Sequence, residues 1–156
     1  MSELSSTIDR TDFHPRILFV ISLVVFIANG YLFMFIRERY FPELSGDAFK
    51  ETDSKYYIFI LACVVGPFVE TFLFQVVPNR FLMWIGVQNE MLLVIVPSIL
   101  FGLFHTYDVL YVVSAALGGV ILNYLYLSYK KRIRYAFYYV FLLHSLYNLY
   151  GFLFIE

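Results

Sequence analysis

The chain of 156 residues is 61% hydrophobic and 21% aromatic, while only 15% of its residues are charged. This balance is far from that of a soluble domain and indicates an integral membrane protein. A net charge of −1 gives no reason to expect nucleic-acid binding. The single cysteine, Cys63, excludes a disulfide framework within the chain.

Five apolar runs have roughly the length that a helix needs to cross a hydrocarbon core of about 30 Å. They cover approximately residues 17–36, 56–77, 90–105, 109–129 and 135–155. The third run is short and contains Pro97, so we expect a tilted or re-entrant segment there. The predicted fold is all-α, a polytopic transmembrane helix bundle of about five spans with its polar site inside the bundle.

The polar connections predict the domain organisation and the orientation in the membrane. Residues 1–16 form a polar tail, and residues 17–156 leave room for one transmembrane helical domain. The first apolar run is too long for a signal peptide, and we expect it to be retained. The longer connections are 37–55 and 77–90, and the densest basic cluster lies at 130–134. Lys and Arg are more frequent on the side of the N-terminus, which favours a cytoplasmic N-terminus. The basic loop near Lys130 and the lack of an organellar targeting segment favour a prokaryotic plasma (inner) membrane.

Setting aside Tyr, Cys and the ends of the predicted spans, three ionisable side chains lie within them: Glu70, His105 and His144. Such groups are costly in hydrocarbon, so they usually face a bundle interior or a watery cavity and contact one another. Any one of them could simply join two helices by a hydrogen bond. Because they come from three different helices, we expect them to converge on one functional site.

Each of these residues has companions at helical spacing. His144 and Asn148 are four residues apart in "HSLYN", so an imidazole and an amide share one helix face. Phe101 and His105 share a face in "FGLFH". Thr71 and Gln75 share a face in "ETFLFQ", about 100° away from that of Glu70.

This set of residues favours hydrolysis by an activated water. A carboxylate and an imidazole beside one water make a general-base pair, and a second imidazole with an amide can stabilise the oxyanion that forms at an attacked carbonyl. Alternatively, Glu70, His105 and His144 could hold a divalent metal such as zinc with one position left for water. The residue pattern alone leaves both alternatives open.

The ordered motifs "ETFLFQ", "FGLFH" and "HSLYN" resemble those of the CPBP intramembrane proteases, also called the Abi or CAAX-protease family. The family motifs are EExxxR, FxxxH and HxxxN, and the resemblance covers approximately residues 60–152. It implies that Glu70 and His105 activate the attacking water, and that His144 and Asn148 stabilise the oxyanion. Phe101, Thr71 and Gln75 would have supporting roles.

The first motif departs from the family pattern at two positions. Thr71 stands in place of the second glutamate and Gln75 in place of the arginine. These positions are one helical turn apart, so the family residues could form an ion pair there. We expect Thr71 and Gln75 to form a neutral hydrogen-bonded pair with a structural role.

The sequence therefore predicts an intramembrane endopeptidase that acts on a lipidated, membrane-anchored or exported protein or peptide within the lipid bilayer. The alternative is a non-catalytic membrane protein, such as an immunity or scaffold protein, that retains the same fold. A proton-coupled transporter is a weaker alternative because the chain is short and shows no inverted repeat.

Overall fold

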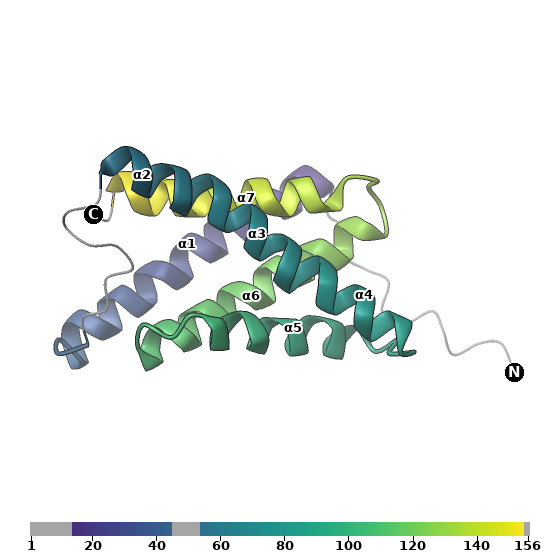
Figure 1. The fold of residues 1–156 in the computed structure, drawn as a ribbon, viewed down its shortest axis with the longest axis horizontal. Helices are drawn as coiled ribbons and strands as arrows, with labels where there is room; N and C mark the ends of the chain where they lie inside the picture. Colours follow the sequence, from purple (N-terminus) through teal and green to yellow (C-terminus); the bar gives the residue numbers. More distant parts are fainter. Residues whose placement is uncertain (1–13, 45–53, 155–156) are drawn as a thin grey trace, which may run out of the picture.

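The computed structural model describes residues 14–44 and 54–154, and the part of the chain that it describes contains helices and no strands (Figure 1). Two of the elements, η1 and η2, are π-helical turns. In chain order the elements are α1 (Pro15–Tyr40), α2 (Lys55–Ile60), η1 (Leu61–Val65), α3 (Gly66–Thr71), η2 (Phe72–Val76), α4 (Val77–Trp84), α5 (Glu90–Phe104), α6 (Val109–Lys130) and α7 (Ala136–Phe154). The predicted all-α bundle is confirmed, whereas residues 1–13 of the predicted polar tail lie outside the described residues.

Among the described residues, three continuous helices are long and apolar enough to cross a membrane: Pro15–Tyr40, Lys55–Trp84 and Val109–Lys130. The third predicted span becomes the shorter apolar helix α5, and the tilted or re-entrant placement expected there stays a prediction. The last span becomes α7, which is 19 residues long. The chain is thus an integral membrane helix bundle.

Short polar side chains begin several of the helices by capping their first free N–H groups. Ser54 accepts a hydrogen bond from the backbone N–H of Tyr57 at 3.2 Å, ahead of α2. Asn89 does the same ahead of α5, and Asp108 accepts one at 2.8 Å from the N–H of Tyr111 at the start of α6. Asp108 thereby fixes the short connection that follows His105.

The segments α2 to α4 form one long helix, and two predicted boundaries were wrong. Residues 77–90 were expected to be a polar connection, but α4 continues the helix through Pro78 to Trp84. The π-turn η2 precedes Pro78 directly and changes the hydrogen-bond register, so the missing N–H of the proline does not break the helix. Likewise α1 runs on to Tyr40, into the predicted connection 37–55.

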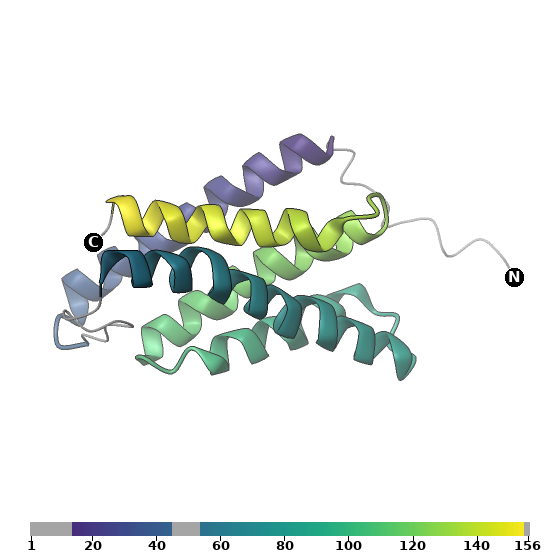
Figure 2. The ribbon, with the colours of Figure 1, turned by 45° about the horizontal axis from the view of Figure 1, so that its top comes forward.

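The bundle is built from antiparallel neighbours. Figures 1 and 2 show α5 alongside α6 and the long α2–α4 helix alongside α7, with α1 crossing the other side of α6 and α7. The apolar core contains fully buried side chains of α6 and α7, namely Leu122, Leu125, Val140 and Leu143. The side chains of the site lie where α3, α5 and α7 converge.

Gly102 allows α5 and α6 to approach each other closely. A Cβ atom at this position would lie 2.6 Å from the Cβ of Ala116 and 2.7 Å from the carbonyl oxygen of Val112. Small residues at such contacts let helix backbones pack tightly in membranes, where no hydrophobic driving force acts between the helices.

Gly102→Ala is expected to destabilise the protein by about 1–3 kcal/mol, because neither the helix backbone nor Ala116 can move away easily. The matched control is Gly151→Ala in α7, where an added Cβ meets nothing within 4 Å. Both changes gain the same helix propensity, so thermal unfolding of the solubilised variants isolates the clash. Equal melting temperatures for the two variants would contradict this packing account.

Candidate active site

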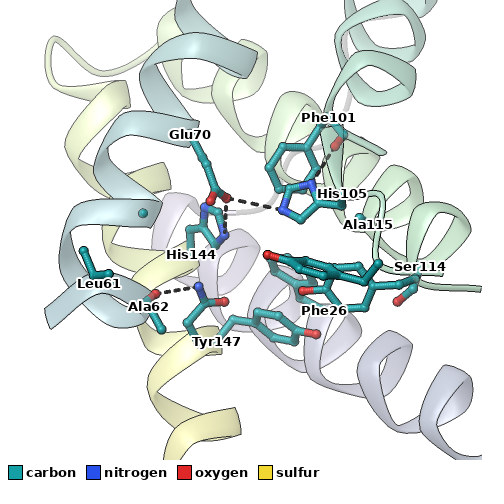
Figure 3. Close-up of a pocket in the computed structure, with 14 residues that line it drawn as sticks. Phe26, Leu61, Ala62, Glu70, Phe101, His105, Ser114, Ala115, His144 and Tyr147 are labelled. Carbon is teal, nitrogen blue, oxygen red and sulfur yellow. Dashed lines mark hydrogen bonds and ion pairs between the residues drawn. The ribbon is translucent and has the colours of Figure 1, made fainter. Parts of the chain in front are cut away.

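A cavity of about 170 Å³ lies between the helices, and the predicted site residues line it (Figure 3). Glu70 reaches it from α3, His105 from the end of α5, and His144 and Asn148 from α7. Phe101 forms part of the wall. The convergence expected from the sequence is therefore observed for these five residues.

The carboxylate of Glu70 lies between the two imidazoles. Its Oε2 atom is 3.7 Å from Nε2 of His105 and 3.6 Å from Nε2 of His144. The side chain of Glu70 is 26% exposed, whereas those of His105 and His144 are 14% and 4% exposed. The cluster is thus largely enclosed, with the carboxylate as its most accessible member.

A short hydrogen bond fixes the orientation of the His105 ring. Its Nδ1 atom is 2.6 Å from the backbone carbonyl oxygen of Phe101, one turn earlier at the end of α5. A carbonyl oxygen can only accept, so Nδ1 carries the hydrogen. In the neutral ring, Nε2 therefore presents its lone pair to the cavity and to Glu70. The Phe101 ring packs against the imidazole at 4.4 Å between centroids.

His144 is held mainly by aromatic packing. Its ring lies between Phe26 and Phe101, with centroid distances of 6.2 and 5.8 Å. Within the described part of the chain, its Nδ1 atom is buried without a hydrogen-bond partner. The position of this imidazole therefore depends on the surrounding rings and on Glu70.

A π-turn in the neighbouring helix positions Asn148. The backbone N–H of Gly66 donates to the carbonyl of Leu61, five residues earlier, and Pro67 has no N–H to offer. In this register, neither residue donates to the carbonyl of Ala62. That oxygen instead accepts a hydrogen bond of 2.7 Å from Nδ2 of Asn148 (Figure 3).

Thr71 and Gln75 do not form the hydrogen-bonded pair that the sequence predicted. Both side chains are fully buried, but neither lines the cavity. The predicted hydrogen bond between them was wrong, because Thr71 Oγ1 and both polar side-chain atoms of Gln75 lack a partner within the described residues. The π-turn η2 starts at Phe72 and shifts the helix register, so residues four apart no longer lie directly above one another.

Sequence reasoning missed several residues of the cavity. Phe26, Ser114 and Tyr147 line it, and the rings of Phe26 and Tyr147 stack with 3.8 Å between centroids. Phe26 belongs to α1, outside the expected core of residues 60–152. The available signal was Asn29, a lone amide in the first apolar span, which donates to the backbone carbonyl of Ser114 at 3.0 Å.

Glu70, His105 and His144 are the residues that could hold a metal ion. Among the described residues, no group of three or more His, Cys, Asp or Glu side chains is arranged to hold one. Nδ1 of His105 bonds to a carbonyl and leaves Nε2 for a ligand, an arrangement that suits a metal as well as a water. The zinc-bound alternative stays a prediction, and the chemistry proposed below uses no step through a metal.

Comparison with known proteins identifies the family. The model of the Rce1-like type II CAAX prenyl endopeptidases matches residues 52–150, which is more than half of the chain. The chain belongs to this family. No curated protein and no solved structure matches it.

The Rce1-like family confirms the predicted resemblance to the CAAX proteases and gives the chain its general function, that of a membrane-embedded type II CAAX endopeptidase. The matched range includes all three motifs and ends before Gly151. Helix α1 lies outside the range, although its Phe26 forms part of the cavity wall.

Pro67→Ala should slow peptide cleavage by about tenfold or more. The new N–H at position 67 can donate to the carbonyl of Ala62 in the π register and compete with Asn148, and small displacements of a catalytic group have large effects on rate. Thermal stability should be retained, because the helix gains a hydrogen bond. Cleavage rates and melting temperatures of the purified variants test this.

Pro78→Ala is the matched control, since Pro78 also follows a π-turn but the hydrogen bond of Asn148 to Ala62 lies at the other turn. Its cleavage rate should stay close to that of the native protein. Equal losses in the two variants would mean that the prolines act on the helix in general, and the positioning of Asn148 would then need another cause.

Proposed function

We propose that the protein is an intramembrane endopeptidase in which Glu70 and His105 activate the attacking water, and His144 and Asn148 stabilise the oxyanion. The observation that carries this proposal is the convergence of both imidazoles on one oxygen of Glu70, at 3.6 and 3.7 Å, inside a cavity between helices. The resemblance to the CAAX proteases supports the same assignment of roles.

The geometry around His105 suits a bridging water. The carboxylate of Glu70 is an acceptor, and neutral His105 presents a lone pair at Nε2 because its Nδ1 hydrogen is used by Phe101. Two acceptors 3.7 Å apart do not bond to each other, but one water can donate a hydrogen to each. The lone pairs of that water are then free to attack a carbonyl.

The reaction follows from these positions. As the water oxygen bonds to the carbonyl carbon of the substrate, its proton passes to Glu70 or His105 and the carbonyl oxygen becomes an oxyanion. The same group returns the proton to the leaving amine when the carbon–nitrogen bond breaks. One N–H of the Asn148 amide is held by Ala62, so the other remains available to the oxyanion.

The cavity surroundings favour a membrane-associated substrate. Aromatic side chains from α1, α6, α7 and the connection after α5 form much of the wall: Phe26, Tyr111, Tyr147 and Tyr107. Such a wall suits a lipidated or membrane-anchored peptide segment that enters between the helices. The prokaryotic plasma membrane and the cytoplasmic N-terminus are proposed from the sequence alone.

Glu70→Gln is expected to reduce peptide cleavage by about 100-fold or more, because the amide nearly keeps the shape of the side chain but cannot accept the proton. Glu90→Gln is the matched control: Glu90 is exposed and pairs with Lys131, away from the cavity. Mass spectrometry of protein termini, in cells that express each variant at equal membrane levels, measures cleavage and identifies substrates. Unchanged termini in Glu70→Gln cells with a retained cellular phenotype would favour the non-catalytic alternative.

Treatment of the purified protein with a metal chelator should leave its cleavage rate unchanged. The reason is that the proposed step needs only a water held between Glu70 and His105. Loss of activity with chelator and its recovery with zinc would overturn the metal-free mechanism and favour the metal-bound alternative.

A further inference from the structure

A basic groove lies at the end of the bundle where α4, the end of α6 and the start of α7 meet, the end at which α4 is labelled in Figure 1. Its volume is about 470 Å³. Three exposed cations line it, Arg80 from α4, Lys130 from the end of α6, and Arg134 from the connection to α7. None of them lines the cavity of the candidate active site.

These cations have no acidic partner within the described residues. Glu70 contacts the two histidines of the candidate active site, and Glu90 pairs with Lys131. Lys130 donates a hydrogen bond to the sulfur of Met83, and its ammonium group lies over the ring of Tyr126. The groove therefore concentrates positive charge that no described carboxylate neutralises.

The rest of the groove is apolar and continues toward the middle of the bundle. Phe68, Phe72, Val76 and Arg80 of the long helix all line the groove, so they form one row that ends in the cation. Phe137 at the start of α7 packs edge-to-face against Phe68 at 5.2 Å between centroids. Exposed phenylalanines thus adjoin a cluster of positive charge.

We propose that this groove binds an anionic phospholipid of the surrounding membrane, with the phosphate between Arg80, Lys130 and Arg134 and an acyl chain along the phenylalanine row. Guanidinium groups match phosphate oxygens in geometry as well as charge. The first residues of α7, Ala136 and Phe137, also line the groove, so the positive end of that helix dipole adds to the attraction. Basic pockets between transmembrane helices are typical sites for anionic headgroups.

Both parts of the groove match an anionic lipid: the cations complement the charge of its phosphate, and the phenylalanine row contacts an acyl chain. A soluble phosphate would satisfy the three cations but leave the phenylalanine row without a contact, and a neutral lipid would do the reverse. An anionic lipid satisfies both, and the membrane supplies it at high local concentration. The occupant would hold the α4 end and the α7 end of the bundle together without contacting the candidate active site.

Native mass spectrometry of the detergent-solubilised protein tests the proposal by titration with phosphatidylglycerol and with phosphatidylcholine of the same chain length. One tightly bound phosphatidylglycerol is expected, and Arg80→Gln with Arg134→Gln should weaken it about 25-fold, at about fivefold for each cation. Lys131→Gln is the matched control, because it removes a neighbouring charge that pairs with Glu90 instead. Its affinity should stay within about twofold of the native value, a margin well below the fivefold for a groove cation.

A single variant and a competition experiment complete the test. Arg134 lies outside the helices, so Arg134→Gln keeps the test valid if the double variant does not fold. Its affinity for phosphatidylglycerol should still fall about fivefold. Glycerol 3-phosphate should not compete with the lipid at equal concentration. Equal binding of the two lipids, equal binding by the double variant and Lys131→Gln, or displacement by glycerol 3-phosphate would each overturn the proposal.

Discussion

The structure depends on the placement of one carboxylate within an apolar helix of a membrane bundle. Glu70 stands in an apolar helix, and its charge is tolerable there only if other polar groups from the bundle surround it. The two imidazoles supply that surrounding, each within 3.7 Å of the same oxygen. Because the three residues come from α3, α5 and α7, the requirement of one side chain ties together the helices that form the cavity. The proposed role of Glu70 as a general base rests on the same contacts.

The site also depends on the backbone, through the two π-turns η1 and η2. Each turn directly precedes a proline, Pro67 or Pro78, at a point where an α-helical register would clash with the ring and lose a hydrogen bond. A wider turn avoids the clash, and at the first site it leaves the carbonyl of Ala62 for Asn148. The backbone irregularity therefore lies at the site, as is common for π-turns. At the second site it separates Thr71 from Gln75, so the replaced motif pair no longer bonds.

The cavity and the basic groove lie toward opposite ends of the bundle. The cavity of the candidate active site involves Tyr107 and the connection after α5, whereas the basic groove lies at the end where α6 passes into α7. Buried polar side chains connect the interior between them: Asn79 donates to Asn123 at 3.0 Å, and Asn123 donates to Ser98 at 3.3 Å. Hydrogen bonds of this kind join α4, α5 and α6 where apolar packing alone gives little specificity. The bundle can thus hold its cavity open at one end while it presents positive charge to the membrane at the other.

The sequence by itself determined the fold class, the approximate spans and the residues that converge, because hydropathy, helical spacing and the cost of charge in hydrocarbon are local properties of the chain. Glu70, His105, His144 and Asn148 could be predicted on those grounds together with the family resemblance. The tertiary structure decided what depends on hydrogen-bond register and on contacts between distant segments. The continuation of the helix through Pro78 and the part of Phe26 in the cavity wall belong to this second group. Periodicity assumes a regular helix, so it gives no warning of a π-turn, and it does not say which helices will be neighbours.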